Sequence, residues 1–195
     1  QLLSMFGTPC DEVETSEFTC GDLMNYHGYD YATVQIGEQC WFAENLRTEH
    51  YANGDAVQGE LSISEWSNSD SGAQAIFDND TLNLADYGRL YNGYAVVDNR
   101  GLCPTGWNVP TDGEWMILEI QLGMSEEEAN QQYNHGTDQG IQLKNSVADI
   151  PAWNGTNTSG FSAAPGGYLY SSFDQLGDFA LFYTASTLSE FGQSF

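Results

Sequence analysis

The sequence predicts a single α+β domain that is built from short helices and β-hairpins and is stabilised by disulfides. Three observations lead to this fold class. A stretch of alternating residues followed by a tight turn is typical of a hairpin, and two capping boxes mark the starts of helices. The four cysteines are even in number and widely spaced, which is typical of disulfides rather than of a zinc site. A chain of 195 residues is long enough for one sizeable core and short for two.

The hairpin is predicted in the first quarter of the chain. The stretch YATVQI alternates at period two and places Ala32, Val34 and Ile36 on one face. The dipeptide Gly37-Glu38 then fits a tight turn into the stretch QCWFA. We therefore expect two antiparallel strands here.

The cysteines offer a way to fasten this hairpin. Cys20 and Cys40 lie at its two ends in the sequence, and a bond between them would staple it. Four cysteines allow three pairings, so pairings that involve Cys10 and Cys103 remain open.

Before and after the hairpin the sequence is more polar. Residues 1–19 form an acidic lead-in, and we assign residues 20–195 to the single domain. Residues 50–86 are rich in Gly, Ser, Asn and Asp, which predicts a long surface excursion with one helical turn at SISEW. Leu90, Tyr94 and Val97 then follow helical spacing, which predicts a short helix.

The stretch GLCPTGWNVPTDGEW leads into the clearest helix. Thr111 and Glu114 have the spacing of a capping box, in which each side chain binds the backbone amide of the other residue. Trp115, Leu118 and Leu122 form the expected buried stripe of this helix. A glycine after the stripe is expected to end it.

A second capping box begins at Ser125, with Glu128 three residues later. It predicts a helix that ends near Gly136, with Met124 and Ala129 in contact as a hydrophobic staple. The Gly-rich aromatic segments that follow are expected to form strands and loops around a core. That core would hold Phe161, Tyr168, Tyr170, Phe182 and Tyr183.

Charge limits the partners of the protein. Four Lys plus Arg stand against 28 Asp plus Glu, a net charge of −24, which argues against nucleic acid and against anionic membrane surfaces. No apolar run is long enough for membrane insertion. The charge and the cysteines together favour an extracellular location, in a saline or calcium-bearing medium or as an ordinary acidic secreted protein. Three glycosylation sequons, at Asn79, Asn154 and Asn157, fit that location.

No catalytic constellation is visible. His27, His50 and His135 are scattered and are expected at the surface, and His27 with His50 would bind a metal only if the fold brought them together. The capping box already explains Glu114. Glu44 is expected to form an ion pair with one of the arginines Arg47, Arg89 and Arg100.

Two binding features remain as candidates. Asp78 and Asp80, with Asp86 nearby, offer oxygen ligands for Ca²⁺, although a solvated acidic loop explains them as well. Trp66 and Trp153 lie in polar stretches, where an exposed indole would stack on a sugar or enter a pocket of a partner. The other three tryptophans are expected in the core.

Three motifs carry a resemblance to a known family. VQIGEQCWFAENLRT, YGRLYNGYAVVDNRGLCPTGWNVPTDGEW and GFSAAPGGYLY resemble the Fibrobacter succinogenes major paralogous domain, and the likeness covers roughly Cys20 to the C-terminus. That family occurs in secreted surface proteins and is distantly similar to the formylglycine-generating enzyme and to C-type lectins. The resemblance implies a C-type-lectin-like irregular domain with short helices packed on small twisted antiparallel sheets. No catalytic activity is established for the family.

The chain departs from the family pattern in two ways. Family members continue past a segment like FYTAST to a strand like GFSVRC, so the last strands are expected to be absent here, supplied by another chain or replaced. The late cysteine of the family, a mate for Cys103, is missing too, so Cys103 would need Cys10 or a partner outside the chain. The paired active-site cysteines of the formylglycine enzyme also have no counterpart, which argues against oxidase chemistry.

We therefore expect a non-enzymatic extracellular structural or adhesive module, a self-assembling subunit of a surface filament or layer. Its partners would be copies of itself or other surface proteins, with residues 1–19 completing a neighbouring copy by strand addition. The alternative is a calcium-assisted carbohydrate-binding module that recognises glycans.

Overall fold

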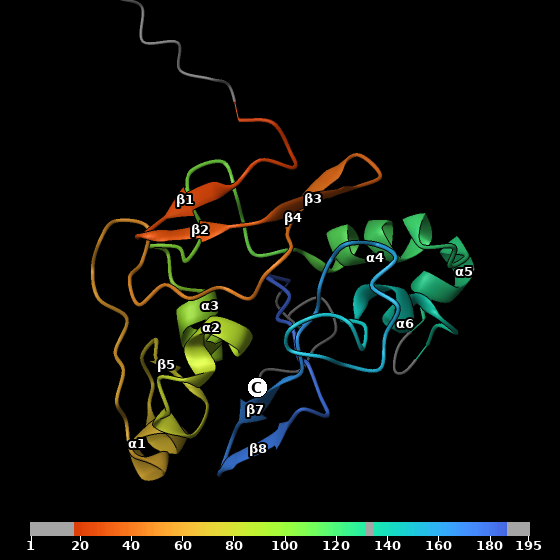
Figure 1. The fold of residues 1–195 in the computed structure, drawn as a ribbon. Helices are drawn as coiled ribbons and strands as arrows, with labels where there is room; N and C mark the ends of the chain where they lie inside the picture. The colour runs from red at the N-terminus through yellow and green to blue at the C-terminus, as the bar shows by residue number, and fades with distance from the viewer. Residues whose placement is uncertain (1–17, 132–134, 187–195) are drawn as a thin grey trace, which may run out of the picture.

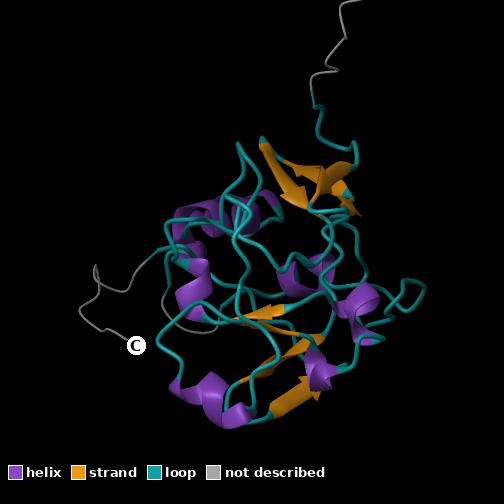
Figure 2. Ribbon diagram, turned by 90° about the vertical axis from the view of Figure 1, so that its left-hand side faces the viewer, coloured by secondary structure: helices purple, strands orange, loops and turns teal. Residues whose placement is uncertain are grey.

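The structure is a computed structural model that describes residues 18–131 and 135–186. In these ranges the strands form four separate two-stranded antiparallel pairs, and short helices lie between them (Figures 1 and 2). The strands are β1 (Met24–Tyr26), β2 (Tyr29–Tyr31), β3 (Thr33–Ile36), β4 (Gln39–Phe42), β5 (Gln74–Ala75), β6 (Leu90–Tyr91), β7 (Gly166–Leu169) and β8 (Phe173–Leu176). The helices are α1 (Ile63–Asn68), the 3₁₀ turn η1 (Phe77–Asn79), α2 (Asn83–Tyr87), α3 (Gly93–Val96), α4 (Asp112–Gln121), α5 (Glu126–Ala129) and α6 (Gln139–Leu143). The predicted α+β class is confirmed.

The predicted hairpin is the pair β3–β4, in which Ile36 faces Gln39 across the turn. The alternating stretch is divided between two strands, because β2 ends at Tyr31 and β3 begins at Thr33. Val34 and Ile36 pack into the same apolar cluster, as the alternation predicts. A second hairpin, β1–β2, precedes this one along the chain and lies beside it in Figure 1.

One disulfide fastens the hairpins. Cys20 is bonded to Cys40, with their Cα atoms 5.8 Å apart, so the segment before β1 is tied to the middle of β4. This confirms the pairing that the hairpin favoured. Cys103 forms no disulfide with a described residue, and Cys10 lies outside the described residues.

Helix α4 is built as its sequence predicts. Thr111 Oγ1 accepts a hydrogen bond from the Glu114 amide at 3.2 Å, and Glu114 Oε2 accepts one from the Thr111 amide at 2.7 Å. Leu118 is fully buried, and Trp115 and Leu122 pack against the same cluster. The buried members of this cluster are Ile36, Trp41, Leu118, Phe161 and Ala163.

The next helix is shorter than predicted. Helix α5 ends at Ala129 rather than near Gly136. Ser125 caps the helix by accepting from the Glu128 amide, but Glu128 Oε1 accepts a bond from the Gly136 amide. Glu128 therefore holds the chain after the helix. Met124 and Ala129 are both buried, and their contact as a hydrophobic staple stays a prediction.

The surface excursion predicted for residues 50–86 is correct only in part: many of these residues are exposed and α1 forms at the predicted helical turn SISEW, but several apolar side chains are buried. Trp66 lies on α1 and is buried, and the strand β5 pairs with β6 inside the molecule. Other buried apolar residues of this stretch are Tyr51, Val57, Ala73, Ala75 and Phe77. Single apolar residues separated by polar ones show no periodic pattern, so the sequence does not predict their burial. Tyr51 and Val57 belong to one apolar cluster, and Ala73 and Ala75 belong to another.

The helix expected from the spacing of Leu90, Tyr94 and Val97 is also wrong in part. Leu90 belongs to β6, and α3 begins after Asn92, whose side chain accepts a hydrogen bond from the Ala95 amide at 3.0 Å. Tyr94 and Val97 are exposed, and the buried residue of this helix is Ala95.

The predicted aromatic core near the C-terminus is correct only for Phe161, which is buried. Tyr168 is half-buried, whereas Tyr170 is 79% exposed, and Phe182 and Tyr183 are exposed as well. Tyr168 lies on β7 and Tyr170 directly follows it. Since β7 and β8 form a sheet of only two strands, these side chains have no larger sheet to pack against. No helix within the described ranges is long and apolar enough to cross a membrane.

Candidate functional site

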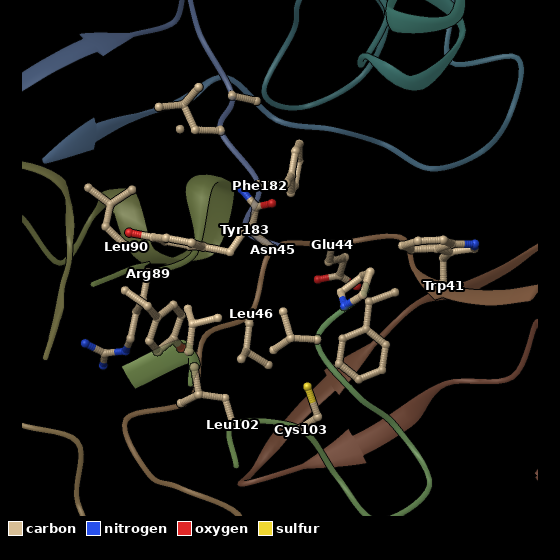
Figure 3. Close-up of a pocket in the computed structure, with 18 of the residues that line it drawn as sticks. Trp41, Glu44, Asn45, Leu46, Arg89, Leu90, Leu102, Cys103, Phe182 and Tyr183 are labelled. Carbon is tan, nitrogen blue, oxygen red and sulfur yellow. The ribbon is translucent and has the colours of Figure 1, made fainter. Parts of the chain in front are cut away.

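A cavity of about 1080 Å³ lies where distant parts of the chain meet. Figure 3 shows Leu102 and Cys103 on one side of it and Phe182 and Tyr183 on the opposite side, with Trp41 on the strand β4. The cavity is partly open to solvent. Its size is that of a binding site for a small molecule or for a few side chains of a partner.

The lining of this cavity is mainly apolar and aromatic. Aromatic rings contact one another around it. The ring centroids of Phe42 and Trp107 are 4.6 Å apart, and those of Trp41 and Trp115 are 4.9 Å apart. The ring centroid of Phe182 lies 5.7 Å from that of Trp115, so Phe182 extends this row of rings. Such a surface favours an apolar or aromatic occupant, because water gains little from contact with it.

Glu44 is the first of the charged residues that line the cavity. Its Oε2 accepts a hydrogen bond from Arg47 at 2.8 Å, and its Oε1 accepts one from the Ala32 amide at 2.8 Å. The predicted ion pair of Glu44 with an arginine is therefore confirmed, with Arg47 as the partner. Both carboxylate oxygens are occupied by structural bonds.

Arg89 and Asn45 are engaged in the same way. Arg89 donates to Gln74 at 2.7 Å, to Glu49 at 3.1 Å and to the carbonyl oxygen of Arg47 at 2.8 Å. Asn45 donates to the carbonyl oxygen of Tyr87 at 2.9 Å. These side chains connect the loops around the cavity.

Glu114 lines the cavity and has the capping role that its spacing predicts. The amide of Thr111 holds the pKa of this carboxyl below its ordinary value, with further hydrogen bonds from the Thr111 hydroxyl and from Asn108. A carboxylate with a lowered pKa is a poor general acid at neutral pH.

Cys103 contributes a thiol to the cavity. Burial raises the pKa of this thiol to about 11. The thiol is therefore protonated at neutral pH, and a protonated thiol is neither a nucleophile nor a metal ligand.

The outer wall of the cavity is formed by the segment that follows β8. The Phe179 carbonyl accepts from the Gly167 amide at 2.8 Å, and the Tyr183 carbonyl accepts from Trp115 Nε1 at 3.2 Å. The side chains of Leu181 and Tyr183 line the cavity and are also exposed to solvent. An occupant of the cavity would therefore contact this wall.

The predicted calcium ligands are not brought together. Asp78, Asp80 and Asp86 are exposed, and the Asp80 Oδ1 accepts a bond from the Leu82 amide at 3.0 Å. In the described part of the chain, no group of three or more His, Cys, Asp or Glu side chains converges. Calcium binding at these aspartates stays a prediction.

The two histidines that were expected at the surface do meet. The ring centroids of His27 and His50 lie 5.6 Å apart. Burial, with a smaller effect of His50, lowers the pKa of His27 below its ordinary value. His135, in contrast, pairs with Glu119 at 3.3 Å.

The predicted contact tryptophans have partners within the chain. Trp66 is buried among Ala73 and Ala75 and lines the cavity, so its predicted contact role would be exercised inside that cavity. Trp153 is half-buried on the cluster around Leu118, and the Lys144 ammonium lies 4.4 Å from its ring centroid.

The three sequons differ in accessibility. Asn79 and Asn154 are exposed and remain predicted glycosylation sites. Asn157 is not, because its amide nitrogen donates to Asp149 at 3.2 Å and to Ser162 at 3.0 Å. A glycan on that nitrogen would break both bonds.

Sequence reasoning did not find the cavity or its wall. The sequence predicts Phe182 and Tyr183 in the core and indicates only a disulfide for Cys103. One available signal is the concentration of aromatic residues in segments far apart in the sequence. It indicates that these segments pack near one another, but not whether a cavity remains between them.

Comparisons with known proteins place the chain in a family. No curated protein and no solved structure matches it. A family model described as the Fibrobacter succinogenes major domain matches residues 34–194, and the chain therefore belongs to that family.

Proposed function

We propose that the protein is a non-enzymatic extracellular structural or adhesive module, and that its cavity receives an apolar segment of a second copy of the chain. The observation that supports this most is the character of the cavity. Its wall is aromatic and apolar, and its charged residues Glu44, Arg89 and Glu114 are bonded within the chain. Such a cavity suits the binding of apolar side chains better than bond cleavage.

The N-terminal lead-in has the composition that the cavity requires. It contains Leu2, Leu3, Met5 and Phe6. These residues precede the part of the chain that the family model matches, so they are an addition to the shared module. We assign residues 1–19 of one copy as the segment that binds to the next copy.

Two further aspects belong to the proposal. The disulfide Cys20–Cys40 supports an extracellular location, because such bonds persist in oxidising surroundings. The short helices and two-stranded sheets are compatible with a C-type-lectin-like arrangement, which we retain as the proposed fold type.

Light scattering tests the assembly. We expect the protein to be larger than its 21.5 kDa monomer at high salt, because salt screens the repulsion between chains of net charge −24. Deletion of residues 1–17 should return it to the monomer. Leu181→Glu should do the same, since it places a charge on the wall of the cavity.

A matched control is available for the second variant. Leu82 is 82% exposed, compared with 65% for Leu181, and it does not line the cavity. Leu82→Glu should therefore leave the assembly intact. A wild-type protein that stays monomeric at about 100 μM at every salt concentration would refute the proposal. Equal effects of the two glutamate variants would refute the role of the cavity.

Carbohydrate binding is the second candidate, and the row of rings around the cavity supports it. Sugars stack on aromatic faces, and Trp107 and Tyr183 both line the cavity. A glycan array decides between the candidates. Specific glycan binding by a monomer would favour the lectin-like function. Loss of this binding in EDTA would show that it requires calcium.

A further inference from the structure

His27 and His50 are brought together by two separate parts of the fold. His27 lies in the turn between β1 and β2, which is visible in Figure 1, and His50 lies in the loop after β4. Their rings meet edge to face, with centroids 5.6 Å apart and planes at 78°. Neither position is part of a motif, so their meeting comes from the tertiary structure alone.

The hydrogen bonds of Thr48 favour one tautomer of His27. The Thr48 hydroxyl donates its single hydrogen to the carbonyl oxygen of His50 at 3.0 Å and accepts from the His50 amide at 3.0 Å. With the Thr48 hydrogen on the His50 carbonyl, the contact between Thr48 Oγ1 and His27 Nδ1 at 2.6 Å has Nδ1 as the donor, and this is the tautomer that we assign. Neutral His27 thus keeps its lone pair on Nε2.

The surroundings hold this imidazole in place. The ring of Tyr26 stacks on it at 4.0 Å with an angle of 21° between the planes. Thr48 is fully buried, so its hydroxyl is a fixed acceptor. A histidine whose Nδ1–H is bound to an oxygen, and whose Nε2 is open, has the arrangement that is usual for metal ligands in proteins.

We propose that His27 and His50 together bind a divalent transition-metal ion, through Nε2 of His27 and one ring nitrogen of His50, with water in the remaining positions. Two imidazoles that bind a tetrahedral zinc ion at about 2.0–2.1 Å have ring centroids roughly 5.2 Å apart. The observed separation of 5.6 Å needs only a small rotation of His50 to match. The imidazole of His50 makes no hydrogen bond to any described residue that would oppose this rotation.

The ligand set selects the class of ion. Neutral imidazole nitrogen suits zinc, copper and nickel, whereas calcium and magnesium prefer oxygen. The net charge of −24 raises the local concentration of any divalent cation. The site is thus distinct from the calcium site that the aspartates suggested.

Isothermal titration calorimetry with Zn²⁺ tests the site in the full-length protein. An excess of Ca²⁺ in the buffer occupies the many surface carboxylates without competing for imidazole. We expect one Zn²⁺ per chain, and binding at least tenfold weaker in His27→Asn and in His50→Gln. Asparagine before Gly28 preserves the tight turn between β1 and β2.

His135→Gln is the matched control, because it removes the third histidine and should leave the affinity unchanged. Absence of zinc binding in calcium, unchanged affinity in both His27→Asn and His50→Gln, or an equal loss in His135→Gln would each overturn the proposal. A second measurement needs no variant. Zn²⁺ should protect His27 and His50 of the wild-type protein, but not His135, from modification by diethyl pyrocarbonate, as read by mass spectrometry of peptides. Equal modification of all three histidines with and without zinc would also overturn it.

Discussion

Each arginine of this strongly acidic chain connects loops that no continuous sheet supports. Arg47 binds Glu44 and the carbonyl oxygen of Asp30, and its guanidinium lies 4.9 Å from the ring centroid of Tyr31. Arg100 binds Asp98 and Asp55. Loop carbonyls and carboxylates without regular strand partners are satisfied in this way, because the planar guanidinium donates in several directions at once.

The Asp98–Arg100 pair makes a contribution to stability that depends on pH. Hydrogen bonds from Arg100 lower the pKa of Asp98 to about 2. Since the folded pKa lies below the unfolded value of about 3.9, the contribution is present above pH 4 and is lost as the pH falls towards 2. In Asp98→Asn the difference in stability from the wild type should therefore shrink over about pH 5 to 2.

Urea denaturation at a series of pH values measures this difference. Asp86→Asn is the control, because Asp86 is exposed and makes no hydrogen bond to the described residues. If the free energies of unfolding of Asp98→Asn and the wild type differed by the same amount at every pH, the lowered pKa of Asp98 would be contradicted.

Gly88 is required by both its conformation and its surroundings. It has φ 69° and ψ −151°, and a Cβ atom there would lie 2.6 Å from Asn45 Cβ. Gly88→Ala should lower the free energy of unfolding by about 3 kcal/mol, from backbone strain and the clash together. Thermal or urea denaturation measures the loss.

Gly101 provides a matched comparison, because it has the same φ of 69° and open space around the missing Cβ. Gly101→Ala should cost about 1 kcal/mol, which is the conformational part alone. Equal losses in the two alanine variants would show that Asn45 gives way to the added methyl group.

The secondary elements are too short to be stable alone. The longest described helix, α4, has ten residues, and isolated helices below about 12 to 15 residues are marginal in water. Their stability therefore comes from caps and from packing. Helix α4 has both, with a complete capping box and the buried Leu118.

Removal of the α4 cap tests the first contribution. Thr111→Ala should lower the free energy of unfolding by about 1 kcal/mol, because the Glu114 amide loses its acceptor. Thr137→Ala makes the same change at an exposed residue whose hydroxyl forms no bond to the described residues, and should have little effect. Indistinguishable denaturation midpoints for the two variants would show that the cap adds nothing.

At the scale of the whole molecule, the disulfide compensates for the small size of the sheets. It joins residues 20 positions apart, and a loop of that length stabilises the folded state by about 3 kcal/mol through the entropy of the unfolded chain. The variant with both Cys20→Ser and Cys40→Ser should lose about that much in urea denaturation. Cys103→Ser should lose far less, because the thiol forms no disulfide among the described residues. A larger loss in Cys103→Ser than in the double variant would contradict this account.

The sequence by itself determined the features that depend on near neighbours. The β3–β4 turn, the capping box of α4, its buried stripe and the Cys20–Cys40 pairing were all predicted. Turn geometry, caps and helical periodicity act over a few residues, and a disulfide that staples a hairpin follows from the hairpin. The motifs also identified the family that the family model shows.

Only the tertiary structure decided which polar stretches enter the core and which aromatic residues leave it. Trp66 became buried and Tyr170 exposed, although local composition indicated the reverse. The cavity and the contact between His27 and His50 likewise join segments that are far apart along the chain. Burial depends on the total packing of all segments, and no local pattern encodes which distant segment will cover a given side chain.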